Sequence, residues 1–265
     1  MKKRSTKEIK LQAKKALQGH FGTVILGLLA VYGLNMLGTV LSTKLFSGTS
    51  ALDLILSEVF MLVVSLIVGI VSAGLGYMLL NISRGKEFSL GDLGYFFKNQ
   101  PDRVIIAGFV LAVIQLVTAI PYYYVSFTTD PGLTIDSQIQ WISMTLGLLA
   151  ISTLLNFLVS LPFAMTYYLM ADDTELGGIQ ALKESARLMK GNIWRYVKLN
   201  LSFIPLILLS VFTFYIALFW IMPYMEMSMT AFYRDLNGEL DHRLPGEGYN
   251  YDYSGDRHDD YNSEA

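Results

Sequence analysis

The chain has 265 residues, of which 53% are hydrophobic and only 16% are charged, whereas a soluble protein carries about 25% charged residues. It has no cysteine and only three histidines, which excludes disulfides, thiol catalysis and zinc–thiolate sites. The formal net charge of −2 hides an uneven distribution of basic residues, and the whole composition predicts an integral membrane protein.

Long stretches without charged residues predict the membrane helices. A helix needs roughly 20 apolar residues to cross the hydrocarbon core, and these stretches are too long and too numerous for the core of a globular protein. We predict an all-α, polytopic helical membrane protein in which residues 1–236 form a single integral membrane domain. Its spans are expected at about 21–43, 59–83, 104–127, 139–165, 196–214 and 216–235.

The last apolar stretch leaves two alternatives. Residues 199–233 contain a single charged side chain, Glu226, and two prolines, Pro205 and Pro223. One span followed by a surface helix would give five spans and leave the C-terminal tail outside. Two short spans that turn near residues 213–215 would give six spans and return the chain to the cytoplasm. We favour six.

The basic residues predict the orientation. Seven Lys and Arg residues precede the first span, four lie between the second and third spans, and five lie between the fourth span and the apolar stretch that begins at 199. The two alternate loops carry one, Lys44. Basic loops stay in the cytoplasm during insertion, so we expect a multi-pass protein of the bacterial plasma membrane with a cytoplasmic N-terminus. The first apolar stretch is longer than that of a signal peptide and is expected to remain uncleaved.

Three segments between the spans have the pattern of amphipathic surface helices, at 5–18, 89–98 and 173–190, the last with Asp173 as its expected cap. In the first, Ile9, Ala13, Ala16 and Leu17 share one helical face. Lysines on the remaining surface suit contact with an anionic leaflet, although they could equally serve only to fix the topology. The candidate headgroup contacts are Lys7, Lys10, Lys14 and Lys15.

The first and third of these helices resemble each other. Aligning Gly19 with Gly191 sets AKKALQGHF at 13–21 against SARLMKGNI at 185–193. In both, the glycine is expected to end a surface helix in the left-handed conformation, after which the chain enters a span. This indicates a parallel internal repeat, and convergence of two interfacial helices is the alternative.

Four segments carry a resemblance to a known family: KEIKLQAKKALQGHFGTVILGLLA, SRGKEFSLGDLGYFF, ALKESARLMKGNIWRYVKLNLSFI and FWIMPYMEMSMTAFYRDL. Over about residues 5–236 the chain resembles an uncharacterised bacterial integral membrane family, domain of unknown function 975. It is more distantly similar to the membrane domain of glycerophosphodiester phosphodiesterases. The resemblance implies a polytopic bacterial protein without established biochemistry. The motif residues are Ser185, Leu188, Met189, Gly191, Asn192, Pro223, Tyr224, Phe232 and Tyr233.

Motifs for chemistry are scarce. The sequence has no zinc-protease helix, no phosphate-binding glycine loop and no nucleophile elbow, so we expect neither an enzyme nor a cofactor or metal site. Glu226 is the one acid within a long apolar stretch, and an acid inside the membrane is a functional candidate by default. The alternative is an interfacial position at which its carboxylate reaches water, because Trp220, Pro223 and Tyr224 are typical of a membrane edge.

The C-terminal segment 237–265 is acidic and poor in aliphatic residues and is predicted to be a disordered tail. The leading functional hypothesis is a non-enzymatic accessory or scaffold protein that interacts with membrane proteins or anionic lipids. The alternative is a small-molecule or lipid transporter with Glu226 near its path, and an intramembrane enzyme comes third. No nucleic-acid partner is expected.

Overall fold

The computed structural model describes residues 3–48 and 50–241, and every regular element in these residues is a helix. Five of the helical segments are long and apolar enough to cross a membrane, which confirms the prediction of an all-α, polytopic membrane protein. Three are single helices: α2 (Phe21–Leu45), α3 (Ala51–Ser83) and α5 (Pro101–Thr128). The fourth consists of three consecutive elements, α6 (Ile135–Ser160), η2 (Leu161–Phe163) and α7 (Thr166–Asp172). The fifth consists of α9 (Ile193–Leu201), α10 (Ile204–Ser210) and η3 (Val211–Thr213).

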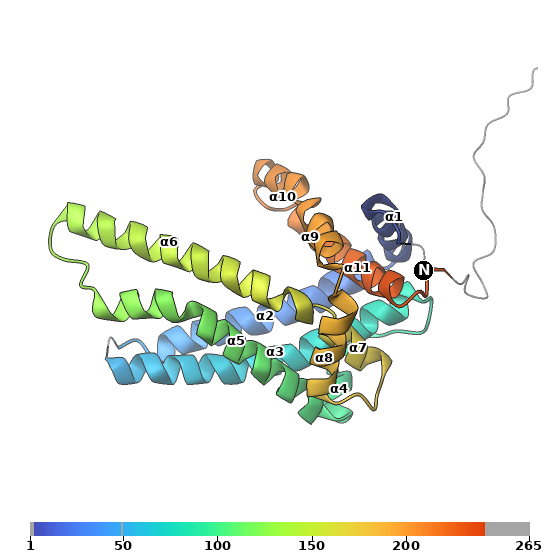
Figure 1. Cartoon of the computed structure of the whole chain (residues 1–265), viewed down its shortest axis with the longest axis horizontal. Helices are drawn as coiled ribbons and strands as arrows, with labels where there is room; N and C mark the ends of the chain where they lie inside the picture. Colours follow the sequence, from blue (N-terminus) through green and yellow to red (C-terminus); the bar gives the residue numbers. More distant parts are fainter. Residues whose placement is uncertain (1–2, 49, 242–265) are drawn as a thin grey trace, which may run out of the picture.

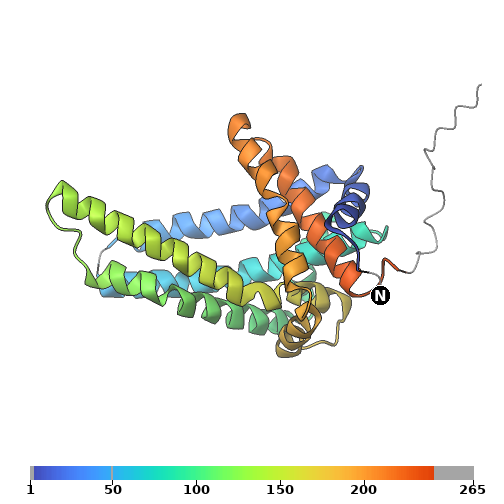
Figure 2. The same ribbon diagram turned by 45° about the horizontal axis from the view of Figure 1, so that its top comes forward.

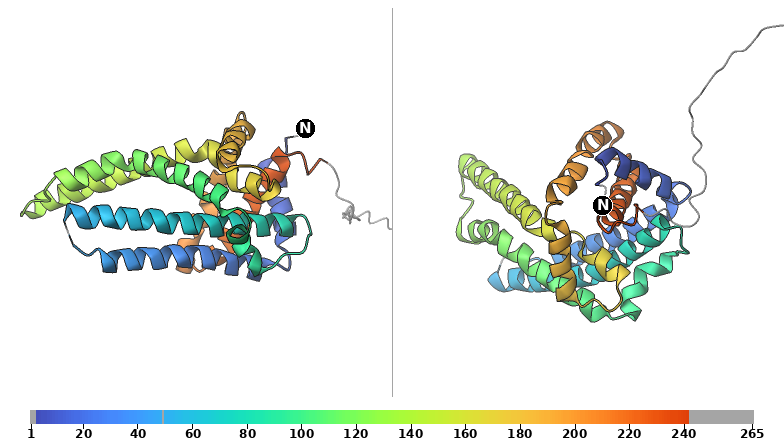
Figure 3. Two further views of the ribbon diagram at one scale, coloured as in Figure 1. Left: turned by 90° about the horizontal axis from the view of Figure 1, so that it is seen from below. Right: turned by 45° about the vertical axis from the view of Figure 1, so that its right-hand side comes forward.

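Two antiparallel helix pairs, α2 with α3 and α5 with α6, form an elongated bundle (Figures 1 and 3). The connections after α2 and after α5 lie at one end, the far end. The other end holds α1 (Thr6–Leu17), η1 (Leu90–Gly94), α4 (Tyr95–Lys98) and α8 (Gly178–Met189). Because the predicted basic segments meet there, we call it the basic end.

A hairpin of α9, α10 and α11 (Leu218–Leu236) leans across the bundle (Figures 1 and 2). The chain reverses at Phe214 and Tyr215, which both have a left-handed backbone with φ of 49° and 64°. The tip of the hairpin stops short of the far end (Figures 1 and 2). Helix α11 is not among the five apolar spans of the described chain, but it leads back to the basic end, where Asp235 contacts Arg4. The described chain therefore ends where it begins.

The buried core lies towards the basic end, and α1 is part of it. Ile9, Ala13 and Leu17, the apolar face of the predicted surface helix at 5–18, are almost fully buried, and α1 packs chiefly against α11. This face is therefore covered by protein instead of lipid. By contrast, α6 packs on α5 and leaves most of its other side chains exposed.

Helices α1 and α8 repeat each other in detail. Each has 12 residues, and each is followed by a left-handed glycine, Gly19 at φ 82° and Gly191 at φ 78°. A shift of 172 residues superimposes 19 on 191, and it also relates the buried Ile9, Ala13 and Leu17 to the buried Ala181, Ser185 and Met189. The two segments therefore form helices of equal length with buried positions in the same register, while α1 packs chiefly on α11 and α8 packs on α5, α7 and η2. The parallel internal repeat itself stays a prediction.

Two predicted boundaries are wrong. The third surface helix begins at Gly178 instead of 173, because Asp173 ends α7 and its carboxylate accepts the backbone N–H of Glu175 in a short loop. The predicted disordered tail begins too early, because Glu239 and Asp241 form ion pairs with arginines at the basic end. The rest of that tail, 242–265, lies outside the described residues.

The fourth span is broken at Pro162, which has no N–H to donate and whose ring prevents a regular helix. Ser185, fully buried on α8, bridges the break. Its hydroxyl donates to the Pro162 carbonyl at 2.8 Å and accepts the backbone N–H of Met165 at 3.1 Å. One side chain thus satisfies two polar groups that the break releases.

We expect Ser185→Ala to lower the free energy of unfolding by about 2 kcal/mol, because it leaves two buried backbone groups without a partner. Thermal unfolding of the purified protein in detergent measures this. Ser143→Ala is the matched control, since that exposed hydroxyl only bonds the Gln140 carbonyl of its own helix. Equal unfolding temperatures for the two variants would show that Ser185 does not stabilise the break.

Candidate functional site

A cavity of about 410 Å³ lies between the bundle and the hairpin, and Glu226 of α11 is among the residues that line it. The walls come from α2, α3, α7, α9 and α11. Polar side chains around it are Tyr32, Ser72, Tyr167, Tyr168, Tyr196 and Asn200, and the remaining lining is apolar. Glu226 is the only charged residue in this lining.

Within residues 3–48 and 50–241, no hydrogen bond or ion pair reaches the two carboxylate oxygens of Glu226. Its backbone carbonyl, besides its place in the helix, accepts a hydrogen bond from the Thr230 hydroxyl. The half-buried side chain lines the cavity. A carboxylate away from bulk water is costly unless it is paired, so this position favours a ligand that brings a positive charge or hydrogen-bond donors.

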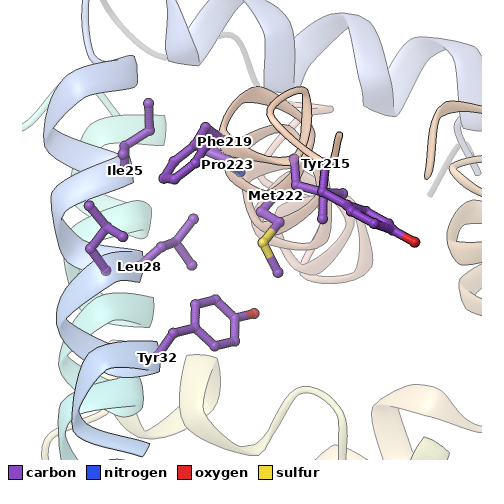
Figure 4. A pocket seen from close by; sticks show the side chains of 9 residues that line it. Ile25, Leu28, Tyr32, Tyr215, Phe219, Met222 and Pro223 are labelled. Carbon is purple, nitrogen blue, oxygen red and sulfur yellow. The ribbon is translucent and has the colours of Figure 1, made fainter. Parts of the chain in front are cut away.

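Next to this cavity lies an apolar groove of about 280 Å³, shown in Figure 4. Ile25, Leu28 and Tyr32 project from α2 towards the hairpin. The opposite wall is formed by Tyr215, Leu218, Phe219, Met222 and Pro223. Leu28 and Tyr32 line both the groove and the Glu226 cavity, so the two spaces are neighbours that share a wall.

A third space, of about 330 Å³, lies between α3, α5 and the end of α6. Its polar residues include Gln115, Asn156 and Ser160, and it shares Ala164 and Tyr167 with the Glu226 cavity. Tyr167 therefore lies between this space and the Glu226 cavity.

At the basic end, a cluster of ion pairs joins segments that are distant in sequence. Asp235, whose side chain is 1% exposed, contacts Arg195 at 2.5 Å and Arg4 at 3.4 Å. We define the ion-pair cluster by two groups that meet on the end of α11: Asp235 with Arg4 and Arg195, and Arg84 with Asp172, Glu239 and Arg234.

Arg84 holds the second group together. Its guanidinium contacts Asp172 at 2.5 Å and Glu239 at 2.6 Å, and Tyr233 donates its hydroxyl to Asp172 at 2.6 Å. Burial alone would lower the pKa of Arg84, but the hydrogen bonds to both carboxylates raise this pKa above its ordinary value. The arginine is therefore a permanent cation that ties α3 to α7 and α11.

Tyr168 connects the cavity to the ion-pair cluster. It lines the cavity, and its ring stacks on Tyr233 with 5.3 Å between the ring centres. The Thr230 hydroxyl is 3.4 Å from the Tyr168 hydroxyl. Tyr233 in turn donates its hydroxyl to Asp172 of the ion-pair cluster. The two stacked rings therefore lie between the Glu226 cavity and the ion-pair cluster.

The remaining motif residues have structural positions. Met189 is fully buried on α8, and the Tyr224 hydroxyl donates to the Lys10 carbonyl at 3.3 Å. The Asn192 side chain accepts a hydrogen bond from Arg195 at 3.2 Å, so the Gly-Asn motif meets the end of α11 through the Arg195–Asp235 pair. Among the motif residues, Pro223 lines a groove that shares Leu28 and Tyr32 with the lining of the Glu226 cavity.

The predicted headgroup lysines divide into two kinds. Lys7, Lys14 and Lys15 are exposed. Lys10 instead donates to the Ser202 carbonyl at 3.0 Å and lies 3.7 Å from the centre of the Phe203 ring. Burial lowers the pKa of Lys10. This lysine holds α1 against the hairpin and is not available as a free headgroup contact.

The family comparison covers nearly the whole described chain. A family model with the description "Protein of unknown function (DUF975)" matches residues 1–239. No curated protein and no solved structure matches the chain. The similarity to the membrane domain of glycerophosphodiester phosphodiesterases therefore remains a prediction.

Proposed function

We propose that this chain, which belongs to the DUF975 family, binds a small organic cation in the Glu226 cavity and transports it, without catalysing a reaction. The observation that carries the proposal is a carboxylate that no other described residue pairs with, in a cavity of about 410 Å³. A cation would neutralise the acid, and the surrounding tyrosine rings attract positive charge through their faces.

Transport requires that the cavity open in turn to each side of the membrane. In the arrangement described here, the Tyr168–Tyr233 stack would close the cavity towards the basic end, and the ion-pair cluster would hold that closure. Opening would separate α11 from α7, which are joined by Tyr233 and Asp172. This is the element that we propose to alternate between two states.

The proposal is tested with tetramethylammonium as the probe on the purified full chain in nanodiscs. We expect saturable binding by calorimetry and a loss of affinity of at least tenfold in Glu226→Gln, which keeps the shape but removes the charge. Glu184→Gln, at an exposed acid on α8, is the control and should bind like the original chain. Uptake of the same cation into proteoliposomes should also depend on Glu226. Absence of binding in the original chain, or equal binding in Glu226→Gln, would overturn the proposal.

We also propose that the basic end faces the cytoplasm of a bacterium and that the protein resides in the plasma membrane. The support is the concentration of lysine and arginine in the segments at this end. Because the chain has no cysteine, single cysteines placed at Lys7 and at Thr134 report the orientation. An impermeant thiol reagent on intact cells should label the second and spare the first.

A second candidate function is an accessory role at the membrane. Helix α6 packs on α5 and offers a long exposed apolar surface to lipid or to a partner helix, while Lys7, Lys14 and Lys15 are free to meet anionic headgroups. Replacing these three lysines with serine should reduce the anionic lipid that is retained by the purified protein in native mass spectrometry. Lys10→Ser should destabilise the fold without reducing the retained lipid. Unchanged lipid retention in the triple variant would argue against this role.

A further inference from the structure

The apolar groove suggests what kind of cation the cavity takes. The groove lies beside the Glu226 cavity, and Leu28 and Tyr32 belong to both linings. Figure 4 shows the Tyr32 hydroxyl pointing into the space between α2 and the hairpin, while Leu28 and Ile25 follow it along the same side of α2. A polar compartment with one acid thus adjoins an apolar compartment.

We propose that the ligand is an amphipathic amine, whose ammonium group lies at Glu226 and whose hydrocarbon chain lies in the groove. This inference rests on the proposed function, because it assigns the substrate class of the same cavity. Hydrocarbon is favoured in the groove because the lining is almost entirely apolar side chains. The ammonium is favoured in the cavity by the carboxylate and by the tyrosine rings.

Charge excludes other amphiphiles from these compartments. None of the residues that line the cavity or the groove is Lys, Arg or His. A phosphate or carboxylate headgroup placed there would lie near Glu226 without a cation to pair with it, which is unfavourable away from water. The site therefore fits a headgroup that is a cation overall and does not fit a zwitterionic or anionic phospholipid.

The groove also indicates the route of entry. Leu29 and Phe219, on opposite walls, are 48% and 49% exposed, and Tyr215 at the tip of the hairpin is 58% exposed. Leu29 belongs to α2, one of the five helices that are long and apolar enough to cross a membrane, so the exposed edge of the groove on this wall faces hydrocarbon. An amphipathic amine that is dissolved in the bilayer would enter sideways, with its chain first in the groove.

The experiment compares three probes on the full chain in nanodiscs: decyltrimethylammonium, tetramethylammonium and decanol. We expect decyltrimethylammonium to bind at least tenfold more tightly than tetramethylammonium. Glu226→Gln should weaken both cations at least tenfold, and decanol should not depend on Glu226. Leu29→Trp, which fills the groove, should remove the advantage of the decyl chain, and its retained binding of tetramethylammonium shows that the variant is folded.

The outcomes separate the two proposals. Equal affinity for the long and short cations, with dependence on Glu226, would overturn the amphipathic ligand and leave the cation-binding function intact. No Glu226-dependent binding of either cation would overturn both. Native mass spectrometry of protein purified from membranes distinguishes the sources of the amine: a retained lipophilic amine identifies a membrane component, and an empty site that binds added amine identifies a soluble one.

Discussion

Asp235→Ala is expected to lower the free energy of unfolding by about 3 kcal/mol, the lower end of the range for breaking a buried ion pair by removing one partner. The Asp235 side chain is 1% exposed and contacts two arginines, Arg4 and Arg195. Alanine would leave both guanidinium groups, which are about one-fifth exposed, without their shared carboxylate. Because these arginines are partly solvated, we do not expect the upper end of that range.

Unfolding in detergent micelles, followed by circular dichroism, measures this loss. Glu184→Ala is the matched control, because the Glu184–Arg187 pair joins neighbouring turns of α8 and is largely exposed. Such exposed pairs contribute about 0–1 kcal/mol. If Asp235→Ala and Glu184→Ala had the same small effect, this would contradict the prediction. The ion pairs of Asp235 with Arg4 and Arg195 would then not hold the N-terminal segment and α9 against the end of α11.

The membrane helices could be predicted from the sequence, because charge-free stretches of this length have few other uses. The same argument located Glu226, since an isolated acid in such a stretch is costly. Its cavity could not be predicted, because five helices build the wall and their packing follows no sequence period. The interior depends on which faces of α2, α3 and α11 meet.

The ion-pair cluster was missed for a related reason. Arg84 and Glu239 are 155 positions apart, and Arg4 and Asp235 are 231 apart, so no local motif joins them. A partial signal did exist: Arg84 directly follows the predicted span at 59–83, and Asp235 ends the predicted span at 216–235. Asp172 was not part of this signal, because the fourth span was predicted to end near 165 and the helical run continues to Asp172. Charged residues of opposite sign at the same end of a bundle are candidates for pairing. The role of Lys10 was also missed, because an amphipathic pattern predicts a buried face without stating whether lipid or protein covers it, and here Lys10 contacts Ser202 and Phe203 of the hairpin.

Gly74→Ala is expected to destabilise the protein by up to about 3 kcal/mol, the upper part of the usual range for overpacking. A Cβ at Gly74 of α3 would collide with the Leu93 carbonyl oxygen of η1 and lie 2.6 Å from its carbonyl carbon and 2.7 Å from the Asp92 carbonyl oxygen. These are backbone atoms, so no side-chain rotation relieves the contact, and η1 must move away from α3.

The control is Gly147→Ala in α6, where a Cβ would meet nothing within 4 Å. That substitution should be neutral or slightly stabilising, because alanine favours a helix over glycine by roughly 0.5–1 kcal/mol. Thermal unfolding of both variants in the same detergent makes the comparison. A Gly74→Ala protein as stable as Gly147→Ala would show that η1 does not pack against α3 at this distance. A large loss for Gly74→Ala alone would show that the close approach of α3 and η1 helps to fix the basic end. The same contact would then also hold the part of α3 that lines the Glu226 cavity, because Ser72 and Gly76 lie two residues on either side of Gly74.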